Sequence, residues 1–371
     1  MTRPTYMTID TGALQNNLQR TRELAPGCSV IAMVKANAYG HGLVRVAQAL
    51  TEADAFGVAS LDEGIRLREA GIQQPIVLME GVFYADELQE AAEYNFHLVV
   101  HHLPHVEMLA QTKVSRPFSV WLKINTGMNR LGIDPNEISS VYNQLMQINL
   151  VKKPIGLMTH FAEADSLTSV ATKEQMQLFY RSINQLSGPR SMANSAAIIA
   201  WPHSHGEWVR PGLMLYGASP FPNRVGSDHG LQPVMTLWSR LIAITKVKKG
   251  FKVGYGGEWC APEDMHVGVV GVGYGDGYPQ FAKSGTPILV GDVECPLVGR
   301  VSMDMLTVDL RMNPKAKIND PVLLWGHGLP VERVAKHSQT SAYEILTRMT
   351  PRPRIEIKET CENYFASLLS S

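Results

Sequence analysis

Short apolar runs alternate with longer amphipathic stretches over roughly the first 230 residues of the chain. The runs are mostly β-branched or apolar without alternation, which is typical of parallel strands buried on both faces. Eight of them occur: SVIAMVK (from Ser29), AFGVAS (from Ala55), PIVLME (from Pro75), HLVVHH (from His97), FSVWLKIN (from Phe118), PIGLMTHFA (from Pro154), RSMANS (from Arg190) and EWVRPGLMLYG (from Glu207). Helical patterns with apolar residues three and four apart lie between them. This rhythm predicts an α/β fold, an eight-stranded (β/α)8 barrel of the TIM type, with a doubly wound open sheet as the alternative.

The pattern changes in the last part of the chain. Strand-like runs punctuated by Gly and Asp turn signals replace the strand-helix alternation, and one helical pattern, SAYEILTRM, lies near the end. We therefore expect a barrel domain at 1–230 and a mostly β C-terminal domain at 231–371, with the boundary in the loop SPFPNRVGSDHG. The opening segment to about Ile9 is a candidate to pair with the second domain.

Composition narrows the class of protein. The 371 residues include 34 basic and 34 acidic side chains, and this zero net charge argues against a nucleic-acid partner. Charged residues make up only 18% of the chain, below the usual value of about 25%, which indicates surface buried between subunits. No secretory signal, no apolar run of about 18 residues and no CxxC pair are visible. We expect a cytoplasmic protein with no membrane partner.

Candidate chemistry gathers at the predicted strand ends, where barrel enzymes place their active sites. The first strand ends in Lys35, the fifth in Lys123, followed by a loop with Arg130, the sixth leads to His160 and the eighth to Arg210. A lysine amine in apolar surroundings has a lowered pKa and can form a Schiff base. The ordinary alternative is a lysine that reaches solvent.

The loops after the seventh and eighth strands favour a phosphorylated ligand. Asn194 and Ser195 precede the helix-like run AAIIAW, where exposed N–H groups attract anions. Gly212 and Leu213 follow Arg210 and Pro211, so that backbone can approach a ligand closely. An ordinary helix cap and a simple turn are the alternatives for the two segments taken singly.

Other polar clusters carry weaker signals. His97, His101, His102 and His105 lie in HLVVHHLPH, but without HExxH-type spacing we interpret them as partly exposed histidines at a strand end. No metal site is predicted. Tyr255 and Tyr274 stand among glycines, where a tight turn can present a phenol; packing on a Gly-rich hairpin is the alternative.

The motifs AMVKANAYGHG, KINTGMNRLG, MTHFA, MANSAA, VRPGLMLYG, VGYGG, VGYGDGYP and VGRVSMDM occur in this order from Val34 to Asp304, and together they resemble those of alanine racemase. The resemblance implies a barrel that binds pyridoxal 5'-phosphate, a following β domain, and a homodimer in which the partner's β domain completes each active site. It also implies interconversion of L-alanine and D-alanine and supply of D-alanine for cell-wall peptidoglycan.

The resemblance assigns a role to each matched residue. Lys35 would hold the cofactor covalently and then move the Cα proton on one face, and Tyr255 of the other subunit would serve the opposite face. Two bases fit the chemistry, since one base would mostly restore the starting enantiomer. The residues implied to bind the cofactor phosphate are Tyr39, Ser195, Gly212 and Leu213, with Asn194 beside them. Arg210, supported by His160, would contact the pyridine nitrogen, and Arg130 would contact both cofactor and substrate. Substrate contacts are implied for Tyr274, Met303 and Asp304, and carbamylation is implied for Lys123.

One departure bears on selectivity. Many family members carry a Tyr near the C-terminus that bonds the phosphate, and the matching position here falls near Pro351. A broader-specificity amino-acid racemase is therefore kept as the alternative function. A basic amino-acid decarboxylase would need a specificity motif for a longer side chain that the sequence lacks. A pyridoxal-phosphate carrier would resemble the barrel alone, without Tyr255.

Overall fold

The computed structural model describes residues 3–359, which form two compact units. One unit comprises residues 18–215 with 220–222, and the other comprises residues 3–17, 216–219 and 223–359 of the described chain. The division differs from 1–230 and 231–371 because the opening strand pairs with strands of the second unit. The boundary between the two units lies within helix α1 (Thr11–Leu24), and the chain passes from the first unit to the second again at residues 216–223.

The first unit is the predicted α/β barrel. All eight expected strands are present: β2 (Ser29–Met33), β3 (Ala55–Val58), β4 (Ile76–Leu78), β5 (His97–Val100), β6 (Val120–Lys123), β7 (Gly156–Met158), β8 (Arg190–Ser191) and β9 (Trp208–Val209). They pair in parallel in the order β8-β7-β6-β5-β4-β3-β2-β9. Near the open join, the Arg210 N–H donates to the Ala193 carbonyl over 2.9 Å, so the barrel is nearly closed.

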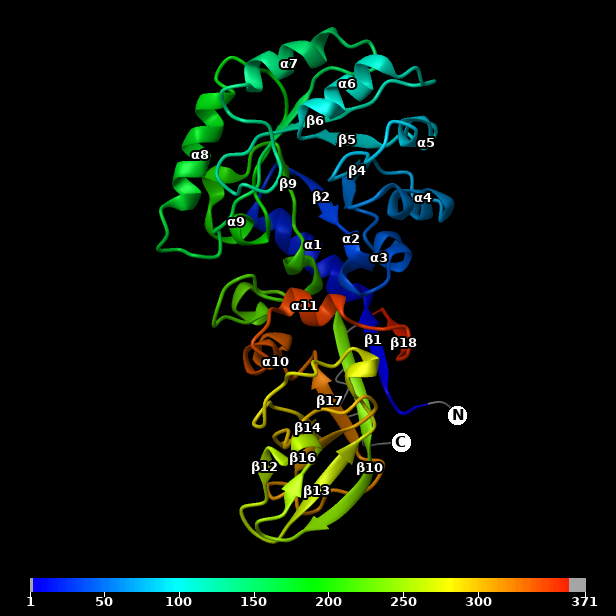
Figure 1. Cartoon of the computed structure of the whole chain (residues 1–371), viewed down its shortest axis with the longest axis vertical. Helices are drawn as coiled ribbons and strands as arrows, with labels where there is room; N and C mark the ends of the chain where they lie inside the picture. Colours follow the sequence, from blue (N-terminus) through cyan, green and yellow to red (C-terminus); the bar gives the residue numbers. More distant parts are fainter. Residues whose placement is uncertain (1–2, 360–371) are drawn as a thin grey trace. The chain divides into compact units, whose positions relative to one another are not determined.

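Helices lie around the strands (Figure 1). They are α2 (Lys35–Tyr39), α3 (Leu43–Ala49), α4 (Leu61–Glu69), α5 (Glu87–Glu93), α6 (Leu103–Gln111), α7 (Ile138–Gln147), α8 (Ala171–Ser182) and α9 (Ser195–Ala200). The α4 helix shows how the sequence sets their limits: the Ser60 hydroxyl accepts the Glu63 N–H, and Gly71 follows at φ +86°. The strands are almost wholly buried, which explains their continuous apolar runs.

The second unit is built on an eight-stranded, mostly antiparallel sheet. Its strands are β1 (Tyr6–Asp10), β10 (Met235–Val247), β13 (Met265–Val270), β14 (Leu289–Val290), β15 (Val293–Glu294), β16 (Leu306–Asp309), β17 (Pro321–Trp325) and β18 (Arg354–Lys358); β11 (Lys252–Val253) and β12 (Trp259–Cys260) form a separate hairpin. The β1 strand runs antiparallel to β10 and parallel to β18, which is why the opening segment belongs to this unit.

Two helices accompany this sheet, α10 (Val331–His337) and the predicted α11 (Ala342–Thr347). Cys28, Cys260 and Cys295 are free thiols, and Cys361 lies outside the described residues. Among residues 3–359, no helix combines the length and the apolar character needed to cross a membrane.

Candidate active site

Lys35 lies two residues after Met33, the end of β2, at the start of a strained turn. The next four residues, Ala36 to Tyr39, all have φ between 51° and 54°, which makes this segment a left-handed turn. Such a conformation costs roughly 1–2 kcal/mol for each residue with a side chain. Two side chains stabilise it: His41 Nδ1–H donates to the Ala38 and Tyr39 carbonyls, and the Glu63 carboxylate accepts the Asn37 N–H. The backbone after Lys35 is thus held in one geometry.

Lys123 at the end of β6 belongs to a group of cations. It is 7% exposed, and burial together with the charges of Arg210, Arg130 and Lys35 lowers its pKa from 10.5 to about 8. Arg130 itself is exposed in the loop after β6. The structure therefore brings together four of the predicted side chains at the carboxyl ends of the strands, where they create a field that favours anions.

Arg210 follows β9 and is held almost entirely by backbone. Its guanidinium is 3% exposed and donates to the Ser191 carbonyl over 2.8 Å, and also to the Ser191 hydroxyl and to carbonyls of Thr159 and Met192. Burial lowers its pKa to about 10, so the group stays cationic at neutral pH. His160 Nδ1 lies 3.4 Å from Arg210 Nη2. Because the guanidinium only donates, this nitrogen must be an acceptor, which agrees with a His160 pKa lowered well below 6.5 by burial and nearby cations.

Ser195 and Gly212 form a close-packed cradle with Tyr39. The Ser195 hydroxyl oxygen accepts the Gly212 N–H over 2.9 Å and the Met214 N–H over 3.3 Å. A hydroxyl has two lone pairs and one proton, so Ser195 has only its O–H left to offer a ligand. A Cβ on Gly212 would lie 2.5 Å from the Tyr39 hydroxyl oxygen, so any larger residue here would force the Tyr39 ring to move.

The neighbouring predicted phosphate residues have other positions. The Asn194 side-chain oxygen accepts the Ala197 N–H over 3.1 Å, so the residue that caps α9 is Asn194, and Ser195 is the first residue of the helix. Leu213 begins the short helical turn η2 (Leu213–Tyr216) with its side chain 1% exposed. Only its backbone can reach a ligand.

Tyr255 belongs to the second unit and is 69% exposed. It begins the turn η4 (Tyr255–Gly257), and Gly254, Gly256 and Gly257 around it all have positive φ. These glycines allow a tight turn that presents the phenol to the outside. The Tyr255 side chain is thus exposed on a glycine turn and is not packed against a hairpin.

The predicted substrate residues of the second unit lie close together. Tyr274 begins the turn η5 (Tyr274–Asp276), and the Met303 carbonyl accepts the Gly275 N–H over 2.9 Å. The Asp304 carboxylate pairs with Arg352 at 2.7 Å and with Arg3 at 3.6 Å. These ion pairs fix the position of Asp304 and of the loop that also carries Met303.

The same two arginines also contact a second carboxylate, that of Asp276. Arg3 also pairs at 2.8 Å with Asp276, which is completely buried, and Arg352 Nε lies 3.4 Å from the same carboxylate. This four-residue network holds together the loops that carry Tyr274 and Met303. Pro351 lies exposed between α11 and β18 and has no hydroxyl to offer a phosphate.

The residues that fix the predicted site side chains could not be identified from the sequence. His41 and Glu63 stabilise the left-handed turn, and Thr159 and Ser191 orient Arg210. A buried histidine directly after a tyrosine and a glycine, in AYGHG, is the one signal in the sequence that points to a turn held by a side chain.

Comparison with known proteins agrees with this geometry. Family models described as the N-terminal and C-terminal domains of alanine racemase match residues 9–220 and 234–357. Biosynthetic alanine racemases of Shigella sonnei and Escherichia coli K12 are 49% identical over 345 residues, which is 93% of this chain and 96% of theirs. The crystal structure of the biosynthetic alanine racemase from Pseudomonas aeruginosa matches with a TM-score of 0.94 and 40% identity, over 96% of this chain and all of that one.

A structure of alanine racemase from Acinetobacter baumannii matches at a TM-score of 0.90 and 41% identity, over 96% of this chain and all of that one. The family models, the curated relatives and the solved structures together identify a racemase, an isomerase built on an α/β barrel with a following β-rich domain. The chain belongs to the alanine racemase family.

Proposed function

We propose that this chain interconverts L-alanine and D-alanine with pyridoxal 5'-phosphate and so supplies D-alanine for peptidoglycan. The observation that carries the proposal is the convergence of Lys35, Lys123, Arg130 and Arg210 beside the Ser195–Gly212 cradle. These cations repel one another and need an anion, and Ser195 has a proton to donate to one. A phosphate supplies both requirements.

The residues present fit the cofactor. Tyr39, the Ser195 hydroxyl and the backbone around Gly212 and Leu213 would hold its phosphate, and Arg210 would face its pyridine nitrogen. When bound, pyridoxal phosphate supplies an electron sink for negative charge at the substrate Cα. Arg210 keeps its proton at neutral pH, since its pKa is about 10, and it therefore does not hand one to the ring nitrogen.

Lys35 and Tyr255 are the two proton-transfer groups of the proposal. Lys35 would hold the cofactor until the substrate amine replaces it, and its freed amine would then move the proton on one face of Cα. Tyr255 of a second subunit would hold the proton on the other face. Two observations support a homodimer: the two groups belong to different compact units, and the Tyr255 ring is 69% exposed in a single chain.

Lys123 is suited to carbamylation. With a pKa of about 8, about one amine in ten is neutral at pH 7, and only the neutral amine attacks CO2. The ammonium first loses one proton, and the nitrogen loses a second as it bonds to the CO2 carbon, so that a cation becomes a carbamate anion and two protons pass to solvent. This change would relieve the repulsion from Arg210 and Arg130 and hold the Arg130 side chain toward the substrate carboxylate.

The second unit would shape the substrate pocket of the partner chain. Tyr274 and the Met303 backbone would contact alanine, and Asp304 would fix their loop through Arg352. Pro351 cannot make the phosphate contact that a tyrosine makes at the matching position of many family members. Turnover of a panel of L-amino acids would therefore distinguish strict alanine selectivity from a broader racemase. Turnover of larger side chains at rates comparable to alanine would favour the broader function.

The test is exchange of the alanine Cα proton. The holoenzyme should exchange deuterium at Cα of both enantiomers, and Lys35→Ala should lose this activity together with the visible absorbance of the bound cofactor. Tyr255→Phe should keep the absorbance and lose turnover mainly from L-alanine. Tyr84→Phe is a matched control, because Tyr84 is also 69% exposed but lies in the barrel unit. Absence of exchange in the wild type would refute the proposed function.

Subunit mixing tests the shared site. Inactive Lys35→Ala and Tyr255→Phe chains, mixed under conditions that exchange subunits, should regain part of the activity because one site of each hybrid is intact. If labelled subunits exchange and no activity returns, the two groups do not come from different chains.

A further inference from the structure

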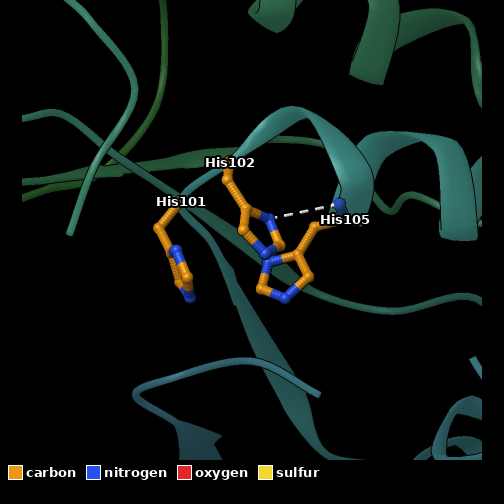
Figure 2. A group of neighbouring side chains, drawn as sticks. All are labelled: His101, His102 and His105. Carbon is orange, nitrogen blue, oxygen red and sulfur yellow. Dashed lines mark hydrogen bonds between the residues drawn. The ribbon is translucent and has the colours of Figure 1, made fainter. Parts of the chain in front are cut away.

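Three histidines that the proposed function does not use come together at the end of β5. His101 follows the strand, His102 precedes α6, and His105 lies in the first turn of that helix (Figure 2). The ring centroids of His102 and His105 are 3.9 Å apart, and each is 4.6 Å from His101. One nitrogen of each ring lies within 4.8 Å of the other two.

Hydrogen bonds fix the tautomers of two of the rings. His101 Nε2 lies 3.0 Å from the Glu80 carbonyl oxygen, and His105 Nε2 lies 2.9 Å from the Val82 carbonyl oxygen. A carbonyl only accepts, so both Nε2 atoms carry hydrogen and both Nδ1 atoms hold an open lone pair. Backbone carbonyls that orient histidines through the remote nitrogen are the usual outer partners of metal ligands.

The buried nitrogen of His105 lacks a partner. Its side chain is 5% exposed, and within the described residues Nδ1 makes no hydrogen bond. An unsatisfied buried polar atom costs roughly 1–3 kcal/mol, so a ligand at this nitrogen is favoured. Gly81 makes room for the ring, since a Cβ there would lie 2.6 Å from His105 Cε1.

We infer that His101 Nδ1, His102 Nε2 and His105 Nδ1 form a binding site for a divalent transition-metal ion of the zinc class. Imidazole nitrogens suit Zn²⁺, Cu²⁺, Ni²⁺ and Co²⁺, and three histidines leave a fourth position for water. Tetrahedral bonds of about 2.0–2.1 Å place ligand nitrogens about 3.4 Å apart. The three ligand nitrogens now lie within 4.8 Å of one another, and movement of the exposed His102 side chain would bring them to this tetrahedral spacing.

Metal binding changes one hydrogen bond at the helix start. His102 Nδ1 now accepts the His105 N–H over 3.3 Å, so its proton sits on Nε2. With the metal on Nε2, that proton moves to Nδ1 and the bond to the His105 amide is lost. The bond is long, so its loss is a small cost against a metal-ligand bond. The His105 amide keeps its other acceptor, the His102 carbonyl oxygen at 3.2 Å, so the start of the helix is preserved in the metal-bound protein.

The test is titration of the metal-free holoenzyme with Zn²⁺ by calorimetry, and with Co²⁺ by its visible absorption. We expect one ion per chain, a Co²⁺ spectrum typical of tetrahedral nitrogen coordination, and a Kd at least about tenfold weaker in His102→Ala. His102 is exposed, so this variant should fold normally. His203→Ala is the control, since His203 is also exposed in the barrel unit but outside the cluster.

Gly81→Ala provides a second test. Its methyl group would lie 2.6 Å from His105 Cε1 and also 2.6 Å from the Val99 carbonyl oxygen, at a residue with a φ of 72°, so its thermal unfolding is measured alongside its metal binding to show that the variant is folded. Loss of tight binding in both His102→Ala and Gly81→Ala, with His203→Ala unchanged, supports the site. Binding that survives His102→Ala, or that weakens equally in His203→Ala, overturns it. Racemase activity is not the readout, so the result is independent of the proposed function.

Discussion

Replacing Gly212 with alanine tests the phosphate cradle by a single methyl group. The added Cβ would lie 2.5 Å from the Tyr39 hydroxyl oxygen and 3.3 Å from Cζ, whereas ordinary contact begins near 3.4 Å. Gly212 has no positive φ, so the backbone tolerates alanine and the clash is the whole effect. The Tyr39 ring is 8% exposed and must move by about 1 Å within a packed core.

The expected cost follows from overpacking. Forcing a methyl group into a packed site destabilises by about 1–3 kcal/mol. For a unit the size of the barrel this corresponds to a loss in Tm of roughly 2–12 °C in the apo-protein. Because the displaced phenol would also leave the proposed phosphate site, affinity for pyridoxal phosphate should fall about tenfold or more, a loss of at least about 1.4 kcal/mol.

A double-mutant cycle isolates the contact. Tyr39→Phe removes the oxygen that clashes and leaves Cζ, which lies 3.3 Å from the new Cβ, as the nearest ring atom. Gly212→Ala/Tyr39→Phe should therefore be about 1 kcal/mol more stable than the sum of the single variants. Stability is measured by urea denaturation of the apo-protein, and cofactor affinity by fluorescence titration. Additive effects would refute the packing of Gly212 against Tyr39.

Three further variants probe the buried charges. Lys123 has a pKa of about 8 against 10.5 when unfolded, so the unfolded chain binds more protons between these values and stability rises across that window. In CO2-free buffer, Lys123→Met should gain at most about 3 kcal/mol at pH 7 and lose this advantage toward pH 10.5, as urea titrations will show. His41, neutral with a pKa of about 4, should cost stability as the pH falls from 6.5 to 4, and His41→Gln should flatten that fall in the same assay. Arg210→Ala should lose about 2–5 kcal/mol in urea denaturation by orphaning buried acceptors, and an unchanged midpoint would contradict this.

The barrel strands could be predicted because the burial of both faces leaves a continuous apolar run in the sequence. The elements that were missed lack such a signal. The β18 strand, with the sequence RIEIK, has no fully buried residue, so its place in the sheet depends on pairing with β1 far away in the chain. The α10 helix, VERVAKH, is too short for its pattern to stand out among strands.

The candidate site was predictable where strand topology determines position. The rule that barrel strands deliver catalytic groups at their carboxyl ends located Lys35, Lys123 and Arg210 without any coordinates. The left-handed turn after Lys35 could not be predicted, because alanine and tyrosine rarely adopt that conformation. It forms through a side chain from the next turn, His41, and one from another helix, Glu63. A contact with a residue on another helix, such as Glu63, cannot be recognised from the sequence around the turn.

The unfavourable features of the barrel are concentrated in one place. Four consecutive left-handed residues follow Lys35. Lys123 and Arg210 are buried near other positive charges, and among residues 3–359 neither forms an ion pair with a carboxylate. Natural chains depart from local rules mainly at functional sites, where the strain is offset by the rest of the fold. A dianionic phosphate would remove the repulsion and use the donors that the strained turn presents. Ligands that bind only the folded state stabilise it by mass action, so a phosphate bound by these residues would raise the stability of the barrel.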